Sequence, residues 1–253
     1  MIRAATFEWG GATYRADLAR PHDLSLPLRP DAPNPNCYWA DAPAAEVIRA
    51  GNFVGSVALG GAVNYRKLSV TPHGNGTHTE CYGHISPDPE ATLDRCLDRF
   101  TFFAHLLTVR PEAEGKDRVI RLAEFRNRLP TPRPEALVLR TLPNGPGKRT
   151  RQYSGTNPPY LEPVIGQFLA DNDVLHLLVD LPSVDREVDG GKLFTHRSFW
   201  RYPGQIRRRA TITELVYVAD DVPDGAYLLQ LHVPQLAMDA APSRPVLYPA
   251  VMV

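Results

Sequence analysis

Three of the eight histidines of this chain, His73, His78 and His84, lie within twelve residues that also contain the carboxylate Glu80. Neutral imidazole and carboxylate oxygens are ligands for divalent metals such as Zn and Mn. Side chains of an extended segment alternate between two sides, so His78 and Glu80 are expected to point to the same side. A cation bound by both side chains would offset their crowding. The pattern therefore predicts a metal site. The alternative is a solvated polar loop.

The segments before this cluster are expected to be strands and loops. Gly10 and Gly11 separate two strand-like runs, residues 4–9 and 12–17, and glycines at these positions favour a β-hairpin. Residues 21–43 are rich in proline, which predicts an irregular covering loop. Strand-like content at 53–57 and 65–70 ends at Pro72, so the histidines are expected where a strand runs into a loop.

Helix-like and strand-like segments alternate along the middle of the chain. Apolar spacing and capping signals predict helices at 91–100, 122–129 and 160–170, and strands at 102–109, 136–141, 174–180, 211–218, 225–233 and 244–248. Such alternation favours a parallel or mixed sheet covered by helices, with additional β-structure at both ends of the chain. We therefore expect an α/β fold, formed as a single domain over residues 1–253.

Composition restricts the kinds of partner. The chain is 43% hydrophobic and 22% charged, and its 28 basic and 28 acidic residues cancel. A chain without net charge has no overall field that would attract it to nucleic acid or to an anionic membrane. We expect a small-molecule substrate and a homodimer or higher homo-oligomer. The N-terminus lacks the apolar run of a signal peptide, which favours a cytoplasmic location, and three cysteines without paired spacing indicate no disulfide framework.

The run Gly76-Thr77-His78-x-Glu80-x-x-x-His84 resembles the signature of the metal-dependent cyclase family, which includes kynurenine formamidases and isatin hydrolase. The resemblance implies that His78 and Glu80 bind metal and that His84 transfers protons. Two positions depart from the signature. Tyr82 replaces a proline, and Gly74 occupies the place of the first ligand histidine. His73, one residue earlier, could reach the metal if Asn75 forms a one-residue bulge; otherwise the site lacks one histidine.

The resemblance extends beyond this motif. Segments 23–28, 139–141 and 179–185 resemble other conserved parts of the family, and His196 and Glu214 fall where the family places a ligand histidine and a ligand glutamate. It implies a cyclase-like swivelling β/β/α architecture. The implied ligand set is His73, His78, Glu80, His196 and Glu214, with His84 as the catalytic acid/base. This set would hold one or two divalent ions, Zn or Mn.

These ligands imply a hydrolase. A cation with an open coordination position lowers the pKa of bound water from ~15.7 to roughly 7, which gives hydroxide for attack on an amide carbonyl. The family resemblance then implies an arylformamidase that converts N-formylkynurenine to kynurenine. The alternatives are an isatin-hydrolase-like enzyme acting on a lactam, imide or lactone, and a metal-binding or ligand-binding relative without catalysis.

Several other residues have two readings. Aromatic side chains near the ligands could line a substrate pocket or belong to the core: Tyr38, Trp39, Phe199 and Trp200. Asp180, at a strand end, could orient a ligand imidazole or cap the following turn. His105 and His176 lie in apolar strands and are expected to be core residues. The basic clusters 149–151 and 207–209 are expected at the surface, with a role in binding a substrate carboxylate or an interface as the alternative.

Overall fold

A long mixed sheet organises the protein. The computed structural model describes residues 2–253. Within them, strands pair in the order β1-β2-β18-β16-β9-β12-β14-β15-β8-β17, and β3 also pairs with β18. Their bounds are β1 Ala4–Trp9, β2 Ala12–Asp17, β3 His22–Asp23, β8 His78–Glu80, β9 Thr101–Val109, β12 Ala136–Thr141, β14 His176–Val179, β15 Thr211–Glu214, β16 Gly225–His232, β17 Ala240–Pro242 and β18 Arg244–Met252.

The centre of the sheet is parallel. Strands β9, β12, β14 and β15 run in the same direction, whereas β16 and β8 pair antiparallel on either side of them. Every residue of β12 and of β14 is buried. A strand covered on both faces can carry consecutive apolar residues, which explains the runs Ala136–Leu139 and Leu177–Val179. The carboxyl ends of these parallel strands meet at one edge of the sheet.

Helices are few and short. They are α1 (Pro72–Asn75), α2 (Leu93–Cys96), α3 (Val164–Asp171) and α4 (Phe194–Trp200), with 3₁₀ turns η1 (Val57–Leu59), η2 (Tyr82–Ile85), η3 (Leu122–Glu124) and η4 (Pro146–Thr150). Helix α3 packs on α4 because Gly166 has no side chain; a Cβ there would lie 2.2 Å from the Ser198 hydroxyl. No helix in residues 2–253 is long and apolar enough to cross a membrane.

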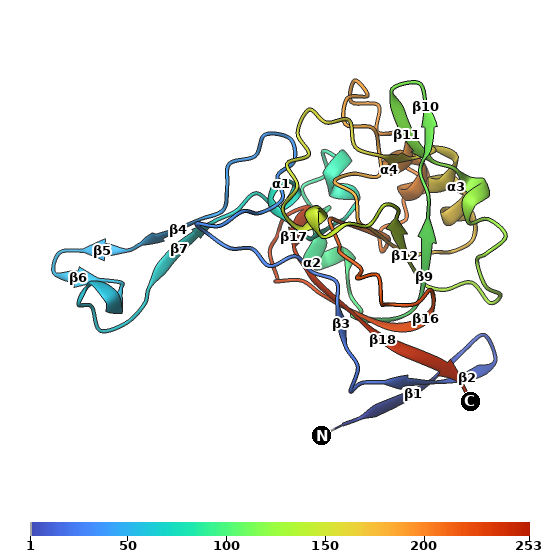
Figure 1. The fold of residues 1–253 in the computed structure, drawn as a ribbon, viewed down its shortest axis with the longest axis horizontal. Coiled ribbons are helices and arrows are strands. Elements are labelled where there is room, and N and C mark those ends of the chain that lie inside the picture. Colours follow the sequence, from blue (N-terminus) through green and yellow to red (C-terminus); the bar gives the residue numbers. More distant parts are fainter. Residues whose placement is uncertain (1) are drawn as a thin grey trace.

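Two smaller β-structures extend from the main sheet. A long arm is formed by β4 (Ala44–Val47) paired with β7 (Arg66–Ser69) and by β5 (Arg49–Ala50) paired with β6 (Phe53–Val54). It projects away from the rest of the molecule (Figure 1). A three-stranded sheet joins the hairpin β10 (Glu112–Glu114) and β11 (Asp117–Ile120) to β13 (Tyr160–Leu161).

The expected α/β class with a mixed sheet and additional β-structure is confirmed, as are the N-terminal hairpin and the proline-rich loop. Two predicted helices are wrong. Residues 91–100 contain one helical turn, α2, and residues 122–129 contain only the 3₁₀ turn η3. The predicted helix 160–170 begins at Val164, because Tyr160 and Leu161 pair with β11 instead. Among the predicted strands, 53–57 shortens to β6 and 211–218 shortens to β15.

Candidate metal centre

Strand β8 presents two predicted ligands on one face. It lies between β15 and β17, and His78 is directly opposite Glu214 in the neighbouring strand. Thr79 points to the other face, where its hydroxyl lies 2.8 Å from that of Thr213. Alternation along the strand therefore directs His78 and Glu80 to the same side, as expected from the sequence. Both residues have no solvent exposure.

The ring of His78 is held in an orientation suited to metal binding. Its Nδ1 lies 2.9 Å from the carbonyl oxygen of Gly76. A proton on Nδ1 donated to that carbonyl leaves Nε2 with its lone pair, the usual arrangement for a ligand histidine. Nε2 is buried and has no hydrogen-bond partner in residues 2–253. The nearest carboxylate oxygen, Oε2 of Glu214, is 3.4 Å away.

Glu80 lies at the centre of the cluster. Its Oε1 is 3.0 Å from Nε2 of His196, and its Oε2 is 3.2 Å from Nδ1 of His73 and 3.8 Å from Nδ1 of His84. Within the described residues, Oε2 is buried without a well-oriented hydrogen-bond donor. A buried carboxylate oxygen and a buried imidazole nitrogen, both unpartnered on the same face, fit the donor set of a divalent cation.

Helix α4 supplies His196, and Asp185 orients it. Asp185 lies 2.6 Å from Nδ1 of His196 and accepts backbone N–H groups of Thr195 and His196 at the start of the helix. With Nδ1 bound to this carboxylate, Nε2 points toward Glu80 and lies 3.9 Å from Oε1 of Glu214. A carboxylate behind a ligand histidine fixes the ring and raises its basicity.

His73 reaches the cluster by a route that differs from the expected bulge. Residues 72–75 form the single helical turn α1, in which the N–H groups of Gly74 and Asn75 both donate to the carbonyl of Thr71. The prediction that Asn75 bulges from an extended strand is therefore wrong. Gly74 packs against the preceding loop, where a Cβ would lie 2.3 Å from that of Ala40. The turn directs His73, not residue 74, to Glu80.

His84 and Asp239 lie at the exposed side of the cluster. His84 comes from η2, and its Nδ1 lies 3.5 Å from Oδ2 of Asp239, which is 2.9 Å from Nε2 of His73. The side chains of His84 and Asp239 are 29% and 33% exposed, whereas that of Glu80 is fully buried. The structure thus brings all six predicted site residues together.

Possible ligand atoms lie within 4.8 Å of one another in three overlapping groups: His73, His78, Glu80; His73, His84, Asp239; and Glu80, His84, His196.

Charges within the cluster shift the pKa values of its members. Burial would raise the pKa of Glu80, but the charges of His84 and His196 outweigh it and hold that pKa well below its usual range. Burial would likewise lower the pKa of His73, but its hydrogen bond to Asp239 and the nearby charge of Glu80 raise it to about 10. Metal ligands must be deprotonated, so a cation bound among these carboxylates would displace the protons that the raised pKa values of His73 and His196 favour.

Two residues beside the cluster, Asp185 and Asp239, were not predicted from the sequence, and the structure excludes one of the two roles considered for Asp180. Asp185 belongs to a segment that resembles the family but was given no role, and Asp239 carries no sequence signal because only the pairing of β17 with β8 brings it close. Asp180 does not orient a ligand. It accepts hydrogen bonds from the backbone and hydroxyl of Thr141 and from Lys148 instead.

The nearby aromatic residues and cysteine fall into separate groups. Phe199 and Trp200 are fully buried core residues, although the Trp200 ring lies 5.4 Å from that of His196. Tyr38 and Trp39 are exposed at 43% and 70%. Cys81 is fully buried, and its thiol donates to the carbonyl of Ala91, so it packs in the core. Tyr82 is buried, and its hydroxyl accepts a hydrogen bond from Arg208.

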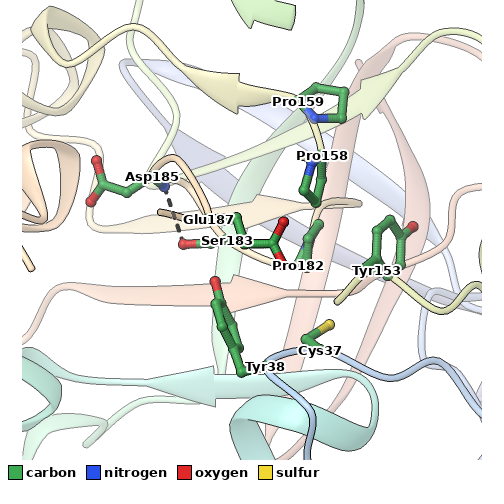
Figure 2. A pocket seen from close by; sticks show the side chains of 9 residues that line it. All are labelled: Cys37, Tyr38, Tyr153, Pro158, Pro159, Pro182, Ser183, Asp185 and Glu187. Atoms are coloured by element: carbon green, nitrogen blue, oxygen red, sulfur yellow. Dashed lines mark hydrogen bonds between the residues drawn. The ribbon is translucent and has the colours of Figure 1, made fainter. Parts of the chain in front are cut away.

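A narrow cavity adjoins the cluster (Figure 2). Asp185, the partner of His196, lies on its wall, and the backbone N–H of Asp185 donates to the hydroxyl of Ser183. The ring of Tyr38 rises from the opposite side with its hydroxyl toward Ser183. The remaining lining residues are Cys37, Tyr153, Pro158, Pro159, Pro182 and Glu187. The cavity combines apolar walls with a few polar groups, but its volume is only about 10 Å³, room for about one water molecule. It is a small side pocket near the candidate metal centre and is too small to hold a substrate.

Residues 22–186, which include the histidine cluster, match the model of the Cyclase family, described as "Putative cyclase". The chain belongs to this family. The cyclase-family chain is 28% identical to the kynurenine formamidase of Bacillus cereus over 191 residues, which are 75% of this chain and 82% of that protein. The kynurenine formamidase of Bacillus anthracis matches with the same identity and coverage.

Solved structures share the fold of this cyclase-family protein. A protein described as a potential metal-dependent hydrolase with cyclase activity has a TM-score of 0.65 and 16% identity, covering 90% of this chain and 97% of its own. Isatin hydrolase A from Labrenzia aggregata, bound to benzyl benzoate, has a TM-score of 0.65 and 15% identity, covering 90% of this chain and 93% of its own. The family resemblance inferred from the motifs is confirmed.

Proposed function

We propose that this protein is a metal-dependent hydrolase of a small amide, with arylformamidase activity on N-formylkynurenine as the leading possibility. One observation carries the proposal. Within residues 2–253, Nε2 of His78 and Oε2 of Glu80 are buried and have no hydrogen-bond partner, and a partly exposed histidine, His84, lies near Glu80. The kynurenine formamidases of two Bacillus species support the choice of substrate, since they align with three quarters of the chain.

The residues that would hold the cation are His73, His78, Glu80, His196 and Glu214. Imidazole nitrogens and carboxylate oxygens of this kind suit Zn or Mn. A divalent ion bound there would supply a water of lowered pKa, from ~15.7 to roughly 7, and would polarise a carbonyl oxygen. Glu80 contacts histidines on two sides through its two oxygens, so it is the residue suited to bridge two ions.

His84 is the group suited to move protons. Its Nδ1 faces the carboxylates of Asp239 and Glu80, which leaves Nε2 for the substrate. The carboxylate of Asp239, 3.5 Å from Nδ1, favours this orientation of the ring by charge attraction. Nε2 could then take a proton from the water that attacks the amide carbonyl and deliver it to the nitrogen that leaves when the C–N bond breaks. His84 is the more exposed neighbour of a fully buried Glu80, so it lies where a substrate would enter.

A panel of substrates tests this proposal. Metal-loaded enzyme is assayed with N-formylkynurenine, isatin and a lactone, and each assay is repeated after chelation and after re-addition of Zn or Mn. We expect metal-dependent turnover that is fastest with N-formylkynurenine. Faster turnover of isatin or the lactone would favour the alternative activity on cyclic substrates. A metal-loaded protein inactive on the whole panel would favour a relative without catalysis.

A further inference from the structure

A second cavity lies at the carboxyl ends of the parallel strands β9, β12 and β14. Its volume is about 150 Å³. Four basic side chains line it, Arg110, Arg118, Lys148 and Arg151, together with one carboxylate, Asp180. Ligands of open α/β sheets commonly bind in crevices at the carboxyl ends of strands. The charge is local, because the chain as a whole has equal numbers of basic and acidic residues.

The polar groups on the floor of this cavity already have hydrogen-bond partners within the protein. Nζ of Lys148 donates to the carbonyl and hydroxyl oxygens of Thr141 and to Asp180, all within 2.7–2.8 Å. Asp180 also accepts the backbone N–H and the hydroxyl of Thr141. An ammonium group has three donors, so Lys148 has none left for a ligand. Since Lys148 and Asp180 neutralise each other, the floor adds no net charge.

The walls carry unpaired positive charge. Arg110, Arg118 and Arg151 form no ion pair within residues 2–253, and the guanidinium of Arg151 lies 5.7 Å from the ring centroid of Tyr153. The acidic residues of the adjacent hairpin β10–β11 are occupied elsewhere. Arg121 pairs with Glu112 and Glu114, and Arg186 pairs with Asp117.

Strand alternation explains why Arg118 remains available. Asp117 and Val119 point to one face of the hairpin, where Val119 lines a different cavity, whereas Arg118 points to the opposite face. The three arginines are exposed and line one cavity, so an anion bound there would be attracted by all three. Guanidinium forks match the paired oxygens of carboxylate and phosphate groups.

We propose that this cavity is a binding site for a small oxyanion, a phosphate or carboxylate group, held by Arg110, Arg118 and Arg151. The site is separate from the metal centre. Tyr153 and Pro159 line both cavities, and Figure 2 shows them across the first cavity from Asp185. Asp185 contacts His196, so the proposed oxyanion site lies away from the metal centre. The proposal does not depend on the hydrolase activity.

Titration calorimetry with inorganic phosphate, and separately with succinate, tests the site. Each titration uses the metal-loaded protein and the chelated protein, together with the variants Arg118→Gln and Arg151→Gln. Arg49→Gln is the matched control, since Arg49 is an exposed arginine of β5 in the distant arm (Figure 1). The affinity order of phosphate and succinate identifies which oxyanion the site prefers.

We expect saturable binding of at least one anion, unchanged by chelation and by Arg49→Gln. Arg118→Gln and Arg151→Gln are each expected to weaken it on the order of tenfold, because each removes one charge-assisted contact. Equal affinity in the two cavity variants and the unmodified protein would overturn the proposal. Binding that disappears with the metal would also overturn it, since the anion would then occupy the metal centre. So would an absence of saturable binding for both anions.

Discussion

His78 and Glu80 each bury one side-chain atom, Nε2 and Oε2, that has no hydrogen-bond partner among residues 2–253. Leaving a buried polar atom unsatisfied costs about 1–3 kcal/mol. Two such atoms on adjacent positions of the same strand face are therefore expensive unless a ligand satisfies both. A shared cation does so, which makes this pair the strongest local argument for metal binding.

The roles of His78 and His84 are separable by substitution. We expect His78→Ala to lose metal because it removes a fully buried imidazole from the proposed ligand set. We expect His84→Ala to keep metal and to lose turnover on the order of 100-fold, the usual contribution of an acid/base group. Metal content and turnover are measured on the same preparations. His232→Ala, an exposed histidine outside the cluster, is the control. Loss of metal in His84→Ala would show that the role given to His84 is wrong.

Substituting His73 tests whether it replaces the ligand histidine that the family signature places at position 74. Since helix α1 places its Nδ1 3.2 Å from Oε2 of Glu80, His73→Ala is expected to lower metal affinity much as His78→Ala does. A metal titration of the variant measures this. Affinity equal to that of the unmodified protein would mean that the cation is held by His78, Glu80, His196 and Glu214 without His73.

Local spacing explains which site residues could be predicted. His78 and Glu80 are two residues apart on one strand, so alternation alone places them together. Asp239 is distant in sequence and reaches the cluster only because β17 pairs with β8. Asp180 and Asp185 are both carboxylates after β14, and composition does not distinguish them. Their partners do: Thr141 and Lys148 surround Asp180, whereas the first turn of α4 lies against Asp185.

At the scale of elements, short apolar patterns led to helices being predicted where the structure has only single turns. Leu93, Cys96 and Leu97 are buried as their helical spacing predicted, yet the helix α2 is a single turn. A short segment can bury an i, i+3, i+4 set from one turn because tertiary packing, not helix length, decides burial. Long apolar strands were predicted well, since β9 and β12 each follow a continuous run that suits a parallel sheet.

Strand β14 carries a histidine that makes stability depend on pH. Burial, with the charges of Arg99 and Arg207, lowers the pKa of His176 from 6.5 to about 3. The unfolded chain therefore binds more protons between these values, and this contribution to stability is lost as pH falls from 6.5 toward 3. We expect the unmodified protein to lose about 2 kcal/mol more than His176→Asn between pH 7 and pH 5.

Urea unfolding of both proteins across this pH range measures the effect. Asn suits the comparison because its side chain does not titrate and can still contact the hydroxyl of Thr211, which lies 2.8 Å from Nδ1 of His176. Parallel pH profiles for the two proteins would contradict the assignment of this dependence to His176.

At the scale of the whole molecule, the projecting arm is the least compact feature (Figure 1). Large hydrophobic side chains are exposed along it: Phe53, Val57, Leu59, Val63, Tyr65 and Leu68. Exposed apolar groups gathered on one element are typical of an association surface. The homo-oligomer expected from the sequence remains a prediction, and the arm is the element we expect it to bury.

Light scattering coupled to size-exclusion chromatography tests this expectation. The unmodified protein is expected to elute as a dimer or larger species, and Leu59→Glu is expected to weaken the association. Val188→Glu, an exposed apolar residue outside the arm, serves as the control. A monomer at all concentrations would contradict the prediction, and so would association that Leu59→Glu leaves unchanged.

The metal content of the purified protein tests the central claim most directly. Elemental analysis after purification without chelators is expected to find at least one Zn or Mn ion per chain, because imidazole and carboxylate ligands already converge on Glu80. After chelation, added Zn or Mn should rebind to the same stoichiometry. Well under one ion per chain, with no uptake when Zn or Mn is supplied, would contradict the account.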